Sequence, residues 1–343
     1  MMKTSLKVCL AASVICLWNL APANADEKPL RARPVAEGLD NPSGVAVNAE
    51  TGHVFFCTRA GVHRLVPGKA GKVYSEVTGF PTDIYGKGPM YDIGPLGVAF
   101  LDNEHLVVGD GSRPDGEELV RVYKVGKEPL STAASEGSAA FTLGPIPAGD
   151  ASAKGEGNFY GVTTNQAGIF ITANGDDTKG WVLRATVQDG KPGELKPFIA
   201  SKEATGTDAP VAITTDAEGR VVIGQMGEMN LPGDSLLTFY DAESGELIRS
   251  LPTGLSDIAG LAYSPKSGKL YCVDFSWAKP EDGGLFELTV TDDAVKTNKI
   301  LSLDKPTALA FDKRGRLYVT VYGTAAEGSE EKGGQLLVVR PGL

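Results

Sequence analysis

One pattern recurs six times along the 343 residues of the chain, and it constrains the fold more than any other feature. Each copy has a small residue, a short apolar strand, a turn carrying Asp, Asn or Gly, a second apolar strand, and a loop that leads to a third strand. The copies begin near residues 44, 97, 161, 212, 260 and 308. Repeated units of about 50 residues with three or four short strands are typical of a β-propeller. A β-sandwich, the alternative fold, does not predict one consensus at a fixed period.

The two ends of the repeat region complement each other. The sixth copy stops at Leu343, directly after its third strand, so its fourth strand is missing. Residues 31–36, which precede the first copy, can supply that strand and leave neither terminal blade with an open edge. The sequence therefore predicts an all-β, six-bladed β-propeller whose last blade is completed by the N-terminal strand. Residues 26–343 are expected to form this single domain.

Residues 1–25 have the features of a secretory signal peptide. Lys3 and Lys7 precede an apolar run over residues 8–17, and Ala23 and Ala25 provide a small-x-small cleavage site. No later stretch approaches the roughly 18 apolar residues that a transmembrane helix needs. We therefore expect an exported protein, periplasmic or extracellular, with no membrane insertion after the signal is removed.

The charge balance bears on the partners of such a protein. The chain has 33 Lys and Arg against 43 Asp and Glu, a net charge of −10. Nucleic acid is not expected as a partner, because recognition of its backbone requires clustered Lys and Arg. An acidic surface suits cationic ligands or Ca²⁺, although the same acidity can serve only to keep the protein soluble.

Three segments resemble a known family. These are Pro-Ser-Gly-Val-Ala-Val at residues 42–47, the Ile-Ala-Gly-Leu-Ala-Tyr repeat with its second strand at residues 258–274, and Pro-Thr-Ala-Leu-Ala-Phe with its second strand at residues 306–319. They resemble NHL-repeat propellers and the gluconolactonase-like, regucalcin-like propellers, over essentially all of residues 31–343. The resemblance implies the six-bladed fold, but this fold carries lactonases, lyases and plain binding modules.

The resemblance also implies where a metal would be held. The lactonases of the family bind a divalent cation at the channel mouth through a Glu, an Asn and an Asp that precede the small residue of different repeats, and such oxygens suit a Ca²⁺-type site. The corresponding residues here are Ser43, Leu96, Tyr160, Val211, Ala259 and Thr307. None is a carboxylate, so the metal ligands of the family do not carry over. Ca²⁺ or another divalent cation stays open as a cofactor, with no ligands assigned.

No catalytic residue is assigned from the sequence. Two of the three histidines, His53 and His105, start second strands, on the face opposite the loops that join second to third strands, and His63 lies in a third strand. None is well placed for general-base catalysis at the usual channel mouth.

The loops on one face of the predicted ring carry the best candidates for ligand contact, because function in such scaffolds usually lies on loops held by a rigid frame. The linker over residues 80–92 mixes aromatics, glycines and both charges, and its alternative role is only to plug the channel. The ligand-binding candidates are Asp83, Tyr85, Lys87, Tyr91, Asp92, Arg113, Asp115, Tyr160, Asn174, Asp176, Gln225, Glu228, Asp274 and Trp277.

Two functions remain open from the sequence. The favoured hypothesis is a non-catalytic propeller that binds a small molecule, glycan or protein through this acidic loop face. The alternative is a lactonase-like hydrolase or lyase that depends on a divalent cation at the channel mouth, with ligands drawn from loop carboxylates: Asp83, Asp92, Asp115, Asp176 and Asp274.

The cysteines provide a test of the blade assignment. After removal of the signal only Cys57 and Cys272 remain, on second strands of the first and fifth blades. A second strand lies one strand spacing, about 4.8 Å, outside the innermost strand of its blade. At that distance from the axis, two blade steps around a six-fold ring separate the two cysteines by on the order of 20 Å. A disulfide needs Cα atoms within about 7 Å. We therefore predict two buried, unpaired thiols.

Overall fold

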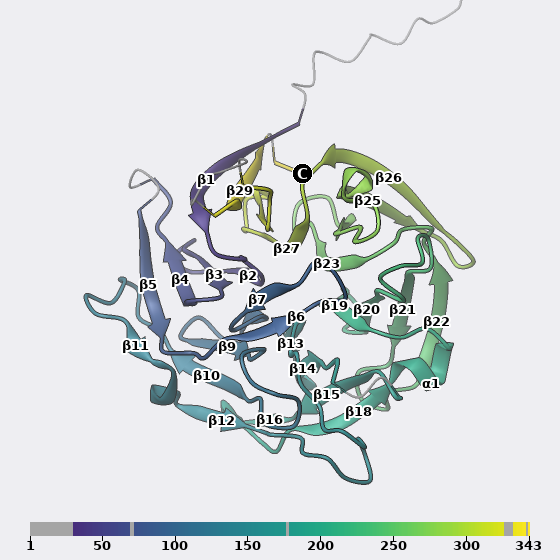
Figure 1. Ribbon diagram of the computed structural model, residues 1–343, viewed down its shortest axis with the longest axis horizontal. Helices are drawn as coiled ribbons and strands as arrows, with labels where there is room; N and C mark the ends of the chain where they lie inside the picture. The colour runs from purple at the N-terminus through teal and green to yellow at the C-terminus, as the bar shows by residue number, and fades with distance from the viewer. Residues whose placement is uncertain (1–29, 69–71, 176–177, 326–331, 341) are drawn as a thin grey trace, which may run out of the picture.

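The computed structural model describes residues 30–343 except 69–71, 176–177, 326–331 and 341. Six sheets are arranged radially around a central channel (Figure 1), so the predicted six-bladed β-propeller is confirmed. The predicted signal peptide lies outside the described residues. Within them, no helix has the length and apolar character needed to cross a membrane.

Each blade is built around four antiparallel strands, and its innermost strand begins within two residues of a predicted repeat start. From the channel outward, the first blade consists of β2 (Val45–Val47), β3 (Val54–Thr58), β4 (Gly61–Leu65) and β5 (Val73–Thr78), and the second of β8 (Val98–Phe100), β9 (His105–Gly109), β10 (Val120–Lys124) and β12 (Phe141–Leu143). The third blade consists of β13 (Val162–Asn165), β14 (Gly168–Thr172), β15 (Trp181–Ala185) and β18 (Lys196–Ala200), and the fourth of β19 (Pro210–Thr215), β20 (Val221–Gln225), β21 (Leu236–Tyr240) and β22 (Leu247–Pro252). The fifth blade consists of β23 (Ile258–Tyr263), β24 (Leu270–Asp274), β25 (Gly284–Val290) and β26 (Val295–Ser302), and the sixth of β27 (Pro306–Phe311), β28 (Leu317–Val321), β29 (Gly334–Arg340) and β1 (Arg31–Leu39).

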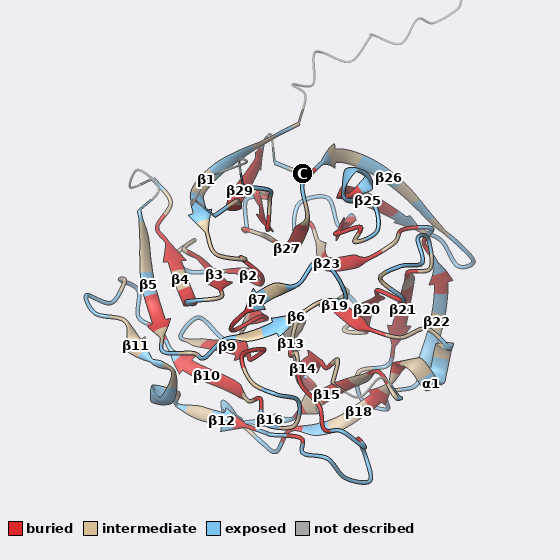
Figure 2. Cartoon of the chain, viewed as in Figure 1, coloured by how far each residue is buried: buried red, intermediate tan, exposed pale blue. Residues whose placement is uncertain are grey.

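The second strands are apolar on both faces because blades pack against them from both sides. Every residue of β3, β14, β20, β24 and β28 is buried. The core therefore lies between neighbouring blades, as where Phe55 and Val62 of the first blade pack with Leu106 and Val108 of the second. Figure 2 shows the buried residues concentrated in the middle strands and the exposed ones on the outer strands.

Strand β1 closes the ring as the sequence predicted. It pairs antiparallel with β29, from Arg31 opposite Arg340 to Leu39 opposite Gly334. The first and last described strands thus complete one blade.

A strap from the second blade covers the outer edge of the first. Residues 126–139, between β10 and β12, include β11 (Ala134–Ser135), which pairs in parallel with β5, and a short 3-10 turn, η1 (Glu136–Ser138). Beneath the strap, the completely buried Arg64 donates to Glu76 at 2.5 Å and to the Gly126 carbonyl at 2.9 Å. The strap thereby covers a charged pair that water would otherwise reach.

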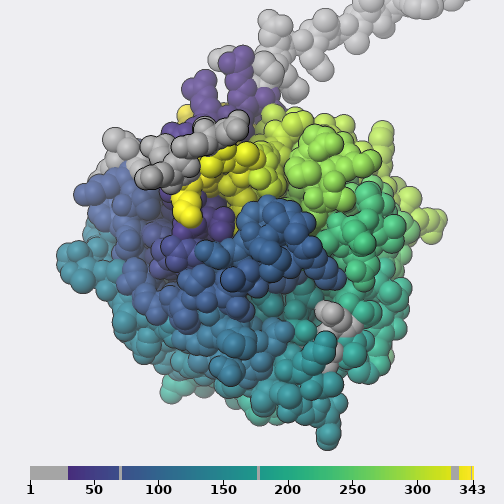
Figure 3. All heavy atoms as spheres, viewed as in Figure 1, coloured from purple at the N-terminus to yellow at the C-terminus, as the bar shows by residue number. Residues whose placement is uncertain are grey.

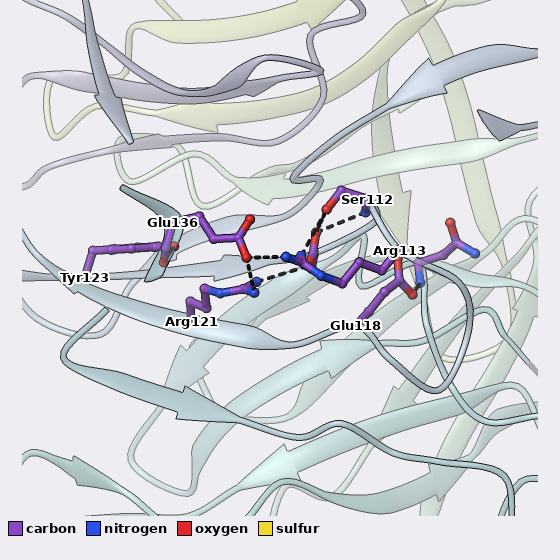
Figure 4. A network of polar contacts seen from close by, with 8 residues as sticks. Ser112, Arg113, Glu118, Arg121, Tyr123 and Glu136 are labelled. Atoms are coloured by element: carbon purple, nitrogen blue, oxygen red, sulfur yellow. Dashed lines mark hydrogen bonds and ion pairs between the residues drawn. The ribbon is translucent and has the colours of Figure 1, made fainter. Parts of the chain in front are cut away.

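Four charged residues tie the strap to its own blade. Arg113 and Arg121 both contact Asp110, and both donate to Glu136 of the strap (Figure 4). The Tyr123 hydroxyl donates to the Glu136 carbonyl at 2.7 Å. Burial of Asp110 and Arg121 makes this network part of the framework rather than a solvated surface cluster.

The remaining elements are short. They are the hairpin of β6 (Asp83–Tyr85) and β7 (Tyr91–Ile93), the hairpin of β16 (Val187–Gln188) and β17 (Lys191–Pro192), the helix α1 (Ser201–Thr205) and the 3-10 turn η2 (Pro280–Asp282).

The two described cysteines are free and buried, as predicted. Cys57 packs in the core between the first and second blades, and Cys272 in the core between the fourth and fifth. Burial raises the pKa of both thiols, so they act as small apolar side chains.

Candidate functional site

The β6–β7 hairpin covers one mouth of the channel (Figure 1). In its register Tyr85 lies opposite Tyr91 and Ile84 opposite Asp92, and alternate side chains of a strand point to opposite faces. Ile84 is 59% exposed, whereas Tyr85 and Tyr91 line a cavity beneath the hairpin. In Figure 3 the blue spheres of this segment lie over the middle of the visible face. The linker therefore plugs the channel and also supplies side chains to its mouth.

Six aromatic side chains line this cavity of about 60 Å³, here called the aromatic chamber: Tyr85, Tyr91, Tyr160, Phe275, Trp277 and Tyr322. The ring centroid of Tyr91 lies 5.4 Å from that of Trp277 and 4.8 Å from that of Tyr322. The Tyr160 hydroxyl donates to the Thr307 carbonyl at 2.7 Å. Burial raises the pKa of both Tyr160 and Tyr322, which keeps their hydroxyls neutral.

The chamber does not fit a lactonase-type metal. Leu96, Tyr160, Val211, Ala259 and Thr307 line it, and these are five of the six positions at which the family resemblance would place metal ligands. Their side chains are apolar or neutral, whereas a Ca²⁺-type site needs six to eight oxygens, usually with carboxylates among them. In the part of the chain that the structure describes, no group of three or more His, Cys, Asp or Glu residues could hold a metal ion.

A second cavity, here called the acidic groove, runs beside the hairpin and has a volume of about 440 Å³. Its charged lining residues are Asp83, Lys87, Asp115, Asp208 and Glu228. Two of the acids are compensated, since Lys202 donates to Asp208 at 2.5 Å and Lys87 lies 3.7 Å from Glu228. The groove is therefore polar, with an excess of negative charge.

Tyr85 separates the groove from the aromatic chamber. It lines both cavities, as do Asn158, Asn174 and Met226. Asn174 donates its amide hydrogen to the Tyr85 hydroxyl at 2.9 Å, which holds the ring between them. The two cavities are therefore neighbours that share one wall.

At the groove wall, Asp115 has a buried neighbour, Glu118. A Cβ at Gly157 would lie 1.8 Å from Glu118 Oε2 and 2.4 Å from Asp115 Oδ1, so both carboxyl groups reach the space that the missing side chain leaves. Asn158 contacts both groups: its backbone N–H donates to Glu118 Oε2 at 2.5 Å, and its side-chain amide donates to Asp115 Oδ1 at 3.3 Å. Asn158 has a φ of +48°, a left-handed conformation that is uncommon outside glycine.

Glu118 has a pKa well above that of an ordinary glutamic acid, which favours its neutral form. Burial raises its pKa to about 9, against the lowering effect of the Asn158 N–H, and the negative charges of Asp110, Asp115 and Asp83 add to the increase. Its neighbour Asp115 is exposed at the groove. Two neighbouring carboxyl groups, one buried with a raised pKa and the other open to a cavity, are an arrangement that acid–base sites use.

Another buried carboxylate lies next to the aromatic chamber. The Trp277 backbone N–H donates to Asp257 Oδ2 at 2.7 Å, and Asp257 is only 1% exposed. Its Oδ1 has no hydrogen-bond partner among the described residues. Burial raises the pKa of Asp257 to about 7, and the charges of Asp274 and Asp234 contribute.

The structure separates the remaining described candidates from both cavities. Asp274 accepts three backbone N–H groups and is buried, and Gln225 bonds to helix α1 and the turn that follows it. Arg113 belongs to the network that holds the strap. Asp92 lies on the outer face of the hairpin, and Asp176 lies outside the described residues.

Several residues in or beside the two cavities were not among the candidates. Glu118 and Asn158 are 40 positions apart, and no sequence signal indicates that they meet. Tyr322 directly follows the second strand of the last repeat, the position that Phe275 has in the fifth repeat. This shared position could have indicated that both rings reach the same mouth.

No protein-family model and no curated protein matches the chain. Solved structures do match it: the PQQ-bound aldose sugar dehydrogenase of Streptomyces coelicolor (TM-score 0.60, 18% identity, 92% of this chain and 99% of that chain) and the calcium-binding protein regucalcin of Agrobacterium tumefaciens (0.54, 11%, 90% and 94%). A protein provisionally assigned as a gluconolactonase also matches (0.56, 15%, 90% and 91%).

These similarities confirm the expected resemblance to gluconolactonase-like and regucalcin-like propellers at the level of the fold, and they add the sugar dehydrogenases to it. The class of protein is thus the six-bladed β-propeller. Identities of 18% or less carry the shared fold and no activity.

Proposed function

We propose that the chain is an exported enzyme that performs acid–base chemistry, a hydrolysis or an elimination, on a small polyhydroxylated molecule in the acidic groove. The pairing of Asp115 with the buried Glu118 is the observation that carries this proposal. The names of proteins with similar folds, an aldose sugar dehydrogenase and a gluconolactonase among them, support a sugar-derived substrate. They favour the enzymatic alternative over the non-catalytic binding module that the sequence favoured.

The two carboxyl groups would have different roles. Asp115, at the groove, would take a proton from a water molecule or a substrate hydroxyl. Glu118 would not touch the substrate, because it is fully buried, but its proton would stabilise negative charge on its neighbour. Asn158 would fix the distance between the two groups through its bonds to both.

The proposed mechanism assigns no step to a divalent cation, and the effect of such a cation on turnover is to be measured. The regucalcin of similar fold is a calcium-binding protein, but the chamber lining here offers no carboxylate among its described residues. Groove carboxylates such as Asp83 and Asp115 are the remaining oxygen donors for Ca²⁺.

The test is a turnover screen of purified residues 26–343 against sugars, uronic acids and sugar lactones, with Ca²⁺ and with a chelator. We expect turnover that survives the chelator and falls at least about 100-fold in Asp115→Asn, a loss typical for removal of an acid–base group. The exposed neighbour Glu117 provides the matched control, and Glu117→Gln should keep full activity. Undiminished turnover in Asp115→Asn would refute the assignment, and loss of turnover with the chelator would move the chemistry to a bound cation.

A further inference from the structure

The aromatic chamber has the properties of a cation-binding cage. The faces of aromatic rings carry negative potential and attract cations within about 6 Å of the ring centroid. The chamber rings are tilted against one another, by 33° for Phe275 and Trp277 and by 90° for Phe275 and Tyr322. These pairs are in direct contact, with ring centroids 4.6 Å apart for Phe275 and Trp277 and 5.7 Å apart for Phe275 and Tyr322, and the cavity lies beside them.

The protein supplies no cation of its own to these faces. Contacts between cations and rings occur elsewhere, as between Arg64 and Phe55 and between Arg249 and Phe239. Within the described residues, no Lys or Arg lies over the rings of Phe275, Trp277 or Tyr322, and none lines the chamber.

Acidic residues lie near the chamber. The acidic groove adjoins it at Tyr85, and a net charge of −10 favours the approach of cations to the protein. Behind the chamber lining, Asp257 accepts a hydrogen bond from the Trp277 backbone N–H, and its other oxygen is buried with no hydrogen-bond partner among the described residues. A positive charge among the rings would compensate a carboxylate that the fold otherwise leaves without one.

The size of the chamber narrows the choice of ligand. A water-sized group needs roughly 15 Å³ of such volume, whereas a benzene ring needs about 150 Å³. The chamber, at about 60 Å³, therefore has room for about two to four heavy atoms. A methylated ammonium group falls within this range, with trimethylammonium at its upper end, and methylated ammonium groups are the cations that aromatic cages recognise.

We propose that the aromatic chamber binds the methylated ammonium group of a small organic cation, which enters from the acidic groove past Tyr85. This site is distinct from the proposed Asp115–Glu118 centre and does not depend on it. The rest of the ligand would extend toward the groove at Asn174, which lines both cavities.

The experiment compares choline with its neutral isostere 3,3-dimethylbutan-1-ol. Residues 26–343 contain two tryptophans, Trp181 and Trp277, so Trp181→Phe leaves Trp277 of the chamber as the sole fluorescent reporter. We expect choline to change this fluorescence saturably and to bind at least about tenfold more tightly than the neutral alcohol, because only the cation is attracted to the ring faces. Equal affinities would overturn the proposal in favour of a merely apolar cavity, as would an absence of choline binding.

Variants locate the binding. Tyr322→Leu and Asp257→Asn should each weaken choline about tenfold, whereas Tyr74→Leu, which removes a ring on the outer strand β5, should not. Trp277→Leu is followed through the choline methyl signal in ligand-observed NMR, with circular dichroism confirming the fold. Unchanged affinity in folded Tyr322→Leu and Trp277→Leu would refute the site. Glu118→Gln, a probe of the proposed enzyme centre, should leave choline binding intact, so the two proposals can fail separately.

Discussion

Replacement of Glu118 by Gln tests the central electrostatic feature of the groove. Glutamine has nearly the shape of protonated glutamic acid but cannot ionise. The pKa of Glu118 rises from an ordinary 4.5 to about 9 on folding. A group with a raised pKa contributes stability that is fully present below its unfolded pKa and is lost as the pH rises through its folded pKa. One pH unit in this interval corresponds to 1.36 kcal/mol. Wild-type protein should therefore lose roughly 3 kcal/mol between pH 4.5 and pH 7 at this residue alone.

The Gln variant lacks this loss, so its stability relative to wild type should increase with pH. Urea unfolding at pH 5, 7 and 8.5 measures the difference, and any constant effect of the amide cancels between pH values. Glu117→Gln, one residue away and exposed, should run parallel to wild type. If the Glu118→Gln and wild-type stabilities also stay parallel over this range, Glu118 is not protonated in the folded protein. That result would remove the basis of its proposed role beside Asp115.

Three further predictions concern the framework. Glu76→Leu should cost about 3–5 kcal/mol in urea unfolding because it leaves the fully buried Arg64 unpaired, whereas Arg64→Met with Glu76→Leu should recover most of this loss; a double variant as unstable as the single one would contradict this. Deletion of residues 31–36 should lower the thermal midpoint of the whole protein, and an unchanged midpoint would argue against closure through β1. Thiol titration of denatured, unreduced residues 26–343 should find two thiols, Cys57 and Cys272, and a lower count would indicate a disulfide.

The repeats made most of the framework predictable. A blade needs an inner strand that begins with a small residue and a second strand that is buried on both faces. In the sequence, these requirements produce a small residue and an apolar segment that recur with a fixed period. Closure was also predictable. The last repeat lacks a fourth strand and an additional strand precedes the first repeat, so pairing of the two completes the last blade. These features can be recognised from the local composition and from the number of strands in each repeat.

The site was harder to predict from the sequence because it depends on contacts that occur only once and not in every repeat. The candidates in the 80–92 linker, such as Tyr85, stood out by composition, yet only the hairpin register shows that this side chain faces the channel. Glu118 lies at the end of an acidic loop that resembles other loops of the chain. Its burial depends on Gly157 and Asn158, which lie in the segment that connects the second blade to the third. The strap was missed for a similar reason, since β11 pairs with β5 of another blade.

The closure by β1 has a consequence for the order of folding. Its partner β29 follows about 300 residues later in the chain, so the hydrogen-bonding edge of β1 stays unpaired until the sixth blade has been synthesised. An unpaired edge is a template for other chains. The interval between synthesis of the first and last blades should therefore be the period in which this protein is most prone to aggregate. A slower passage through the last repeat would lengthen that period without changing any contact of the finished ring.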